Sequence, residues 1–192
     1  MVGVQCSCAD ALADAQNDLS PIAREELANL LQDVRRITDE HAQIMRRITA
    51  LASEDSAYER LRTIPGIGPT LAPALLASIG HAQQFASARQ CSAWAGLVPR
   101  QHGTGGQVQL GSITKNGDRS LRVLLIHGAR TVVRWADKHS HPQSRWIRDL
   151  IARRGKNKAV VALANKLMRI VWVVLTQGVE YDMRKAFRHQ PI

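Results

Sequence analysis

The chain has 192 residues, 45% of them hydrophobic, and a formal net charge of +10. This length suits one domain of ordinary size, or a small domain with an appendage, and the apolar content is enough to bury a core. The longest apolar run, Ile170 to Leu175, is far too short to cross a bilayer, and the N-terminus lacks the pattern of a signal peptide. We therefore expect a cytoplasmic protein with no membrane partner.

The charge is distributed unevenly along the chain. Residues 1–60 hold 6 Lys and Arg against 11 Asp and Glu, a net −5, whereas residues 61–192 hold 20 against 5, a net +15. Between Arg60 and Gly117 the sequence contains no acidic residue. Such a surface cannot neutralise itself and attracts phosphate, so we expect a nucleic acid as the partner.

Residues 1–19 carry little pattern and predict a weakly ordered N-terminus. Ser20 and Pro21 then predict a helix start, with Ser as the N-cap and Pro at the first helical position. Apolar residues follow at steps of three and four, interrupted by His41, and predict a coiled-coil arm over residues 20–58 that joins copies of the chain. One amphipathic helix packed on its own domain is the open alternative. The seam consists of Leu27, Leu30, Val34, Ile37, Ile44, Ile48 and Leu51.

The stretch 61–80, LRTIPGIGPTLAPALLASIG, predicts a helix, a tight turn and a second helix. Glycines at 66 and 68 allow unusual backbone conformations, and amides at the start of the second helix suit a phosphate oxygen. The pattern resembles the helix-hairpin-helix module, which grips a nucleic-acid backbone without reading sequence. An ordinary helical hairpin in a core would show the same spacing. The predicted DNA-binding residues here are Pro65, Gly66, Ile67 and Gly68.

Pro73 constrains where this second helix begins. In the interior of a helix it would cost about 3 kcal/mol. With Thr70 as the N-cap, Pro73 instead falls among the first amides, which have no helical partner. We therefore predict a start at Thr70.

Further helices are predicted from about Ser87 to Ala95, from an Asp118 cap to about Ala136, through residues 146–151, and from Ala159 to about Gln177. Residues 100–120 read as a long glycine-rich loop, a type that is usually functional or disordered. No strand is predicted. The expected fold is all-α, with the arm followed by a helical domain over 59–182 and a basic tail over 183–192.

Basic residues around the loop and before the last helix are candidates for phosphate contacts, Arg especially through its planar fork. A solvated charged face is the alternative for those on the last helix. The candidates are Arg100, Lys115, Arg119, Arg122, Arg154, Lys156 and Lys158.

The sequence predicts no metal site. The five acidic residues after residue 60 are scattered, and a two-metal site needs clustered carboxylates. The cysteines Cys6, Cys8 and Cys91 lack a second pair at zinc-ligand spacing, and their odd number fits a reducing compartment.

Four blocks in this order resemble the C-terminal domain of the bacterial insertion-sequence one-ten transposases, the DEDD-type group that includes the Piv-type DNA invertases. The blocks are LRTIPGIGPTLAPALLASIG, WAGLVPRQHGTGG, LGSITKNGDRSLRVLLIHGAR and ARRGKNKAVVALANKLMRIVWVVL. The resemblance runs from about Leu61 to Tyr181, and the arm before it also fits.

The resemblance implies a function in DNA transposition. Family members have an N-terminal RuvC-like domain, whose four acidic residues bind divalent metal. Their C-terminal domain carries a serine directly before a Gly-Gly pair, and this serine attacks DNA phosphate. They act as oligomers, and many use a structured guide RNA. Here Thr104 stands at the serine position, and Gly105 and Gly106, which follow it, are further candidates for DNA contacts. No segment resembles the RuvC-like domain. Mg²⁺ is expected only with that domain.

We expect this chain to be the DNA-binding and strand-transfer portion of a transposase, and to be inactive alone. Thr104 is the candidate nucleophile, although a hydroxyl in an ordinary Gly turn would look the same. Ser112, Thr114 and Ser120 are alternative hydroxyls, and His102 and His127 are candidate proton shuttles. A non-catalytic nucleic-acid-binding remnant, or a coiled-coil assembly subunit, is the alternative function.

Overall fold

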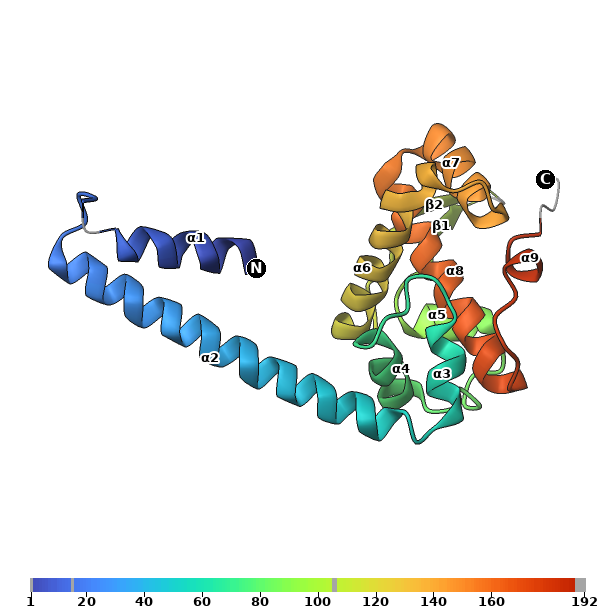
Figure 1. Cartoon of the computed structure of the whole chain (residues 1–192). Helices are drawn as coiled ribbons and strands as arrows, with labels where there is room; N and C mark the ends of the chain where they lie inside the picture. Colours follow the sequence, from blue (N-terminus) through green and yellow to red (C-terminus); the bar gives the residue numbers. More distant parts are fainter. Residues whose placement is uncertain (1, 15, 105–106, 189–192) are drawn as a thin grey trace. The chain divides into compact units, whose positions relative to one another are not determined.

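The computed structural model describes residues 2–14, 16–104 and 107–188 (Figure 1). The chain divides into two compact units, Met1–Ala50 and Leu51–Ile192. Both are mainly helical, as predicted, although the second also contains a two-stranded sheet.

The first unit contains helices α1 (Val2–Ala13) and α2 (Pro21–Ala52), the second of which runs two residues past the unit boundary. The predicted start of α2 is confirmed, because Ser20 Oγ accepts a hydrogen bond from the backbone amide of Ala23 at 3.2 Å. Arg24 ties the connection to this helix, donating to the carbonyl oxygen of Leu12 and to Oδ1 of Asn17, both at 2.6 Å. α1 lies in the segment predicted to be weakly ordered.

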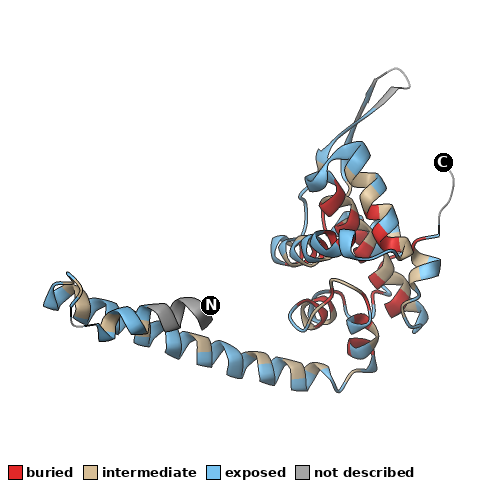
Figure 2. Cartoon of the chain, turned by 45° about the horizontal axis from the view of Figure 1, so that its top comes forward, coloured by how far each residue is buried: buried red, intermediate tan, exposed pale blue. Residues whose placement is uncertain are grey.

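The apolar seam of α2 is largely uncovered within the described residues. α2 has no buried residue, and the exposed fractions of Ile37 and Ile44 are 57% and 53% (Figure 2). Leu27, Leu30 and Val34 line a cleft of 250 Å³ together with residues of α1. The long helix is thus confirmed, while its pairing with a second copy stays a prediction.

The second unit consists of helices joined by short turns and one β-hairpin. Its elements are α3 (Ser56–Arg62), α4 (Leu71–Ile79), α5 (Ala88–Trp94), β1 (Pro99–Thr104), β2 (Gln107–Ile113), α6 (Arg119–Trp135), the 3-10 helix η1 (Ala136–Lys138), α7 (Pro142–Arg154), α8 (Lys156–Gln177) and α9 (Met183–Ala186).

Side-chain caps explain where several of these helices begin. Ser87 accepts a hydrogen bond from the amide of Gln90 at the start of α5, and Asp118 accepts one from the amide of Leu121 at the start of α6. These two starts agree with the prediction. His141 caps α7 through Nδ1, which accepts from the amide of Ser144 at 3.2 Å.

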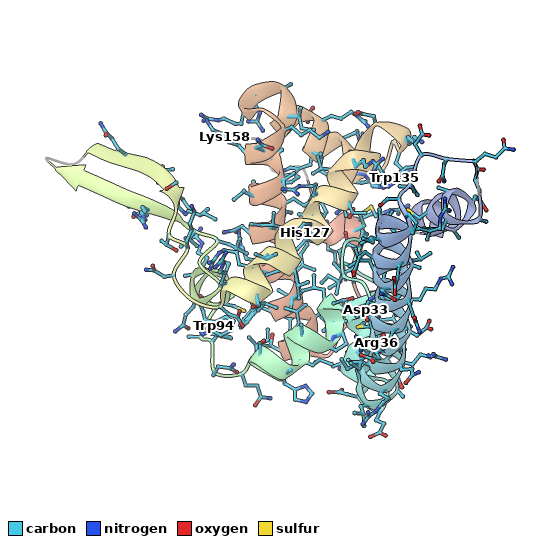
Figure 3. All side chains as sticks on the ribbon, turned by 90° about the vertical axis from the view of Figure 1, so that its left-hand side faces the viewer. Asp33, Arg36, Trp94, His127, Trp135 and Lys158 are labelled. Carbon is cyan, nitrogen blue, oxygen red and sulfur yellow. The ribbon has the colours of Figure 1, made fainter. Side chains whose placement is uncertain are left out.

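The prediction of a long loop over residues 100–120 was wrong. β1 and β2 pair antiparallel, with Gln101 opposite Leu110 and Thr104 opposite Gln107. Pro99 pairs with Ile113, so β2 has one more residue than β1 near the base of the hairpin, as in a β-bulge. The hairpin extends beyond the helices (Figures 2 and 3).

The core is organised around α8, which contacts α3, α5, α6 and α7. Its inward residues are all apolar, and they lie at helical spacing. The buried residues of α8 are Ala159, Val160, Leu163, Ala164, Leu167, Met168, Val171, Val174 and Leu175. By length and composition α8 could also cross a membrane, but half of the relevant window is buried in the chain, as in core helices of soluble domains.

The predicted basic tail is partly structural. Phe187, which follows α9, is 5% exposed, and its ring meets that of Trp146 edge-on with centroids 5.5 Å apart. Residues 189–192 lie outside the described residues.

Candidate nucleic-acid interface

The turn between α3 and α4 has the predicted boundaries. α4 begins at Leu71 with Thr70 as its N-cap, so Pro73 is its third residue, as predicted. However, this helix start offers few free amides for a phosphate. Pro69 and Pro73 have no backbone N–H, and the amide of Ala72 donates to the carbonyl oxygen of Gly68 at 3.0 Å.

Gly66 and Gly68 have different roles in this turn. Gly66 has φ +94° and lies against α6, where a Cβ would come within 3.0 Å of the carbonyl oxygen of Gly128. A Cβ on Gly128 would in turn overlap the carbonyl oxygen of Gly66. A Cβ on Gly68 would meet nothing within 4 Å. Gly66 and Gly128 therefore let the turn pack directly on α6, whereas Gly68 is open.

A groove of 670 Å³ lies between this turn and α6, and we call it the turn groove. Its cations are Arg62 from α3 and Arg130 and Arg134 from α6, and no Asp or Glu is among the described residues that line it. His127 and Trp135 also line it, and both lie along α6 (Figure 3). All four predicted residues of the turn, Pro65 to Gly68, line the same groove. The groove is thus basic on two sides.

Two contacts hold aromatic and cationic groups in place near this groove. Arg62 donates to the hydroxyl of Tyr58 at 3.0 Å, with its guanidinium carbon 5.7 Å from the ring centroid. Lys138 Nζ lies 4.3 Å from the ring centroid of Trp135, which is 47% exposed. An exposed aromatic ring beside cations can stack on an unpaired base.

The predicted cations around the hairpin differ in their exposure. Arg100, Lys115 and Arg119 are exposed, and Arg100 donates to the carbonyl oxygen of Thr114 across the base of the hairpin at 3.2 Å. Arg122 is only 8% exposed, and its guanidinium donates to the carbonyl oxygen of Ala95 at 3.2 Å. This burial contradicts the surface position expected for a phosphate contact. We therefore assign Arg122 to holding the turn before α6.

The basic segment 153–158 is the junction of two helices, so the last helix begins three residues before the predicted Ala159. α7 ends at Arg154, Gly155 has φ +81°, and α8 begins at Lys156. Arg154, Lys156 and Lys158 are exposed. Lys158, at the start of α8 (Figure 3), lines a cleft of 810 Å³ with Ser112 and other residues at the base of the hairpin.

The candidate hydroxyls are spread over the hairpin and its surroundings. Thr104 is the last residue of β1, whereas Gly105 and Gly106 lie outside the described residues. Ser112 is exposed on β2, and Ser120 is exposed in the first turn of α6. Thr114 Oγ1 is shielded from solvent and has no hydrogen-bond partner among the described residues.

Metal-ligating and nucleophilic groups elsewhere are sparse. The part of the chain that the structure describes contains no group of three or more His, Cys, Asp or Glu residues placed to hold a metal ion. Burial raises the pKa of the Cys91 thiol to about 12, so this thiol is protonated at neutral pH.

Sequence reasoning did not assign Arg62, Arg130 or Arg134 to a site. The spacing of His127, Arg130 and Arg134 by three and four residues was a usable signal, because it places them on one face of α6. The approach of Arg62 from α3 had no such signal, since it depends on the contact between Gly66 and Gly128.

Residues 58–145 match the model of the transposase family IS116/IS110/IS902. The chain is 46% identical over 157 residues to a probable family 20 transposase of Pseudomonas aeruginosa, covering 82% of this chain and 46% of that protein. It is 44% identical over 134 residues to the transposase for insertion sequence element IS1111A of Coxiella burnetii, covering 70% and 37%. A pilin gene-inverting protein of Moraxella bovis is 31% identical over 151 residues, covering 77% and 46%.

The chain therefore belongs to this transposase family. It spans less than half the length of these three relatives.

Proposed function

We propose that this chain is the DNA-binding and strand-transfer portion of an insertion-sequence transposase. The observation that carries the proposal is the turn groove, where Arg62, Arg130 and Arg134 converge with no carboxylate among the described lining residues. Its relatives are named as transposases and as a gene-inverting protein, names that refer to rearranging DNA segments.

The groove suits a nucleic-acid backbone better than base edges. Guanidinium groups bind phosphate oxygens through charge-assisted hydrogen bonds, and such contacts carry no direct sequence information. The exposed ring of Trp135 adds a stacking surface for an unpaired base. We infer that side chains, more than the amides of α4, hold the backbone here.

Thr104 supplies the hydroxyl in this proposal. Its Oγ1 would form a bond to phosphorus while the bond to the leaving strand breaks, with its proton passing to a base and cations stabilising the developing charge. Arg100 and Lys158 lie near the base of the same hairpin. The described residues offer no carboxylate cluster for a metal ion. Mg²⁺ would therefore be bound by the acidic residues of a RuvC-like domain, which is not among the described residues.

A salt titration tests the binding. The affinity for duplex DNA should fall with salt, with a log–log slope of about 0.9 per phosphate contacted. Replacing Arg130 and Arg134 by Gln should lower that slope by almost two units if both contact phosphate. The matched control replaces Arg35 and Arg47, two exposed residues on α2, by Gln, which makes the same change in charge. A flat salt dependence of the wild-type chain would refute the proposal.

The chemistry is tested by adduct formation with an acidic partner domain supplied in trans. Thr104→Ser should increase the covalent protein–DNA product, because serine lacks the methyl group that crowds attack on phosphorus, and Thr104→Ala should abolish it. If the Thr104→Ala variant still forms the adduct, another residue is the nucleophile, and Ser112 is the next candidate. Binding without any adduct in every variant would favour the alternative of a non-catalytic nucleic-acid-binding protein. Parallel titrations with a structured RNA test whether a guide RNA is also bound.

We also propose that α2 joins two copies of the chain. Its seam repeats every three and four residues, which matches a helix pair, and Ile37, Ile44 and Ile48 are all exposed. Placing Asp at both Val34 and Ile44 would bury charge in such a pair and should give monomers in sedimentation. A wild-type chain that already sediments as a monomer at about 10 µM, where weak pairs associate, would contradict this assembly.

A further inference from the structure

A second basic cleft lies beside the hairpin and shares no lining residue with the turn groove. It has a volume of 520 Å³, within the usual range of ligand pockets. Three arginines from three different elements line it: Arg89 from α5, Arg100 from β1 and Arg169 from α8. We call it the arginine cleft.

Among the residues that the structure describes, the three guanidinium groups have no acidic partner. None of them belongs to an ion pair formed among the described residues, and no Asp or Glu is among the residues that line the cleft. The pKa of neighbouring Lys166 is lowered, mainly by burial and second by the positive charge of Arg169. Three like charges gathered without neutralisation repel one another, and an anion bound between them would relieve that repulsion.

Polar groups around the cleft are already positioned. Arg100 is oriented by its bond to the carbonyl oxygen of Thr114, which leaves most of its donors free. Asn165 donates to the carbonyl oxygen of Leu97 at 3.0 Å, and Ser92, 1% exposed, donates to that of Arg89 at 3.0 Å. Thr114 Oγ1, which has no partner among the described residues, belongs to the same lining. A shielded hydroxyl with no partner among the described residues has its donor and acceptor capacity available for a bound group.

The location of the cleft indicates which anion it takes. Pro99 and Asn165 line both the arginine cleft and the cleft that contains Ser112 and Lys158. The two clefts therefore flank the base of the hairpin whose first strand ends at Thr104. A strand reaching the hairpin would pass one of them.

We infer that the arginine cleft binds a phosphodiester group of the DNA strand that runs along the β1–β2 hairpin. Arg89 and Arg169 donate to its non-bridging oxygens, and Arg100 positions it at the hairpin base. This inference rests on the proposed function and adds Arg89 and Arg169 to the interface. An extended strand fits better than a free nucleotide, because Pro99 and Asn165 also line the neighbouring cleft that contains Lys158.

The test compares the full chain with the double variant Arg89→Gln, Arg169→Gln. The matched control is Arg145→Gln, Arg184→Gln, which removes the same charge from exposed positions on α7 and α9. The probe is a fluorescent twelve-nucleotide oligothymidylate, measured by anisotropy over a range of salt. We expect roughly tenfold weaker binding for the cleft variant at low salt and a slope smaller by about 1.4. The control should keep the wild-type slope.

Further measurements separate the other outcomes. The variant Arg89→Lys, Arg169→Lys keeps the charge but loses the planar forks, so it should bind with an intermediate affinity. Unchanged tryptophan fluorescence will show that the variants are folded. Thymidine monophosphate that binds as tightly as the oligomer would overturn the strand assignment, and a preference for oligouridylate would overturn DNA as its source. If the wild type binds the oligothymidylate and the cleft variant has the affinity and salt slope of the wild type or of the control, this inference fails while the proposed function stands. If the wild type binds no nucleic acid, the proposed function itself fails.

Discussion

The contact between Gly66 and Gly128 leads to a sharp prediction about Gly128→Ala. In the middle of α6, an added Cβ would overlap the carbonyl oxygen of Gly66 and lie 3.1 Å from its carbonyl carbon. A backbone carbonyl cannot rotate away as a side chain can, so the turn has to move off the helix. The substitution therefore strains both the stability of the second unit and the shape of the turn groove.

The size of the effect follows from two opposing terms. Overpacking costs about 1–3 kcal/mol, and contact with a backbone atom places it near the upper limit. Alanine is favoured over glycine inside a helix by about 1 kcal/mol, which offsets part of that cost. The net loss in the free energy of unfolding is about 2 kcal/mol, which lowers Tm by about 4–8 °C for a domain of this size.

Tryptophan fluorescence during urea unfolding is a suitable assay. All 4 tryptophans lie in the second unit, so the signal reports on that unit alone. Gly68→Ala is the matched control, because its Cβ meets nothing within 4 Å, and it should leave stability equal or slightly higher. If Gly128→Ala is as stable as the wild type or more stable, the turn does not rest on α6 as described. Since Gly66 is structural, Gly68 is also the cleaner position at which to test DNA binding by the turn.

Three further predictions concern single side chains. Arg122→Met should lower the free energy of unfolding by about 1–3 kcal/mol, because it leaves the carbonyl oxygen of Ala95 without its buried donor. Arg119→Met, at the exposed start of α6, should leave the free energy of unfolding unchanged. Equal urea midpoints for the two variants would contradict this role of Arg122. Cys91, with its pKa raised to about 12 by burial, should resist a thiol reagent at about pH 8, so Cys91→Ser should lower the count of reactive thiols only after unfolding. The pKa of His141 is lowered, first by burial and then by the charge of His139, so its capping contribution is present above its ordinary pKa of 6.5 and is lost as the pH falls through the lowered value. Between about pH 7 and pH 5 the wild type should therefore lose more stability than His141→Asn, which caps without titrating, and parallel pH curves would exclude this contribution.

Local signals in the sequence were enough to predict most of the helices. Ser20 with Pro21, Ser87 and Asp118 each placed a helix start correctly, and Pro73 fixed the start of α4. A cap acts on amides two or three residues away, and helical periodicity repeats within four residues, so both are visible in a short stretch of chain. The concentration of basic charge after residue 60 was likewise evident from the sequence.

The hairpin was missed because its own signal is short. Residues 107–113 alternate polar and apolar side chains at Val108 and Leu110, and then Gly111 and the extra residue of the bulge interrupt the alternation. Glycine-rich neighbours made the same stretch resemble a loop.

Sequence alone located the basic segments, but only the tertiary structure decided which cations act together. Arg122 has the same chemistry as Arg119, yet it lies inside because it points back to the carbonyl oxygen of Ala95. Arg169 is far along the chain from Arg89 and Arg100, and the three line one cleft because α5 and the hairpin base both lie against α8. Such meetings depend on which faces of separate elements pack together, and that is set by side-chain fit across the whole core, as at Gly66 and Gly128, rather than by any local pattern.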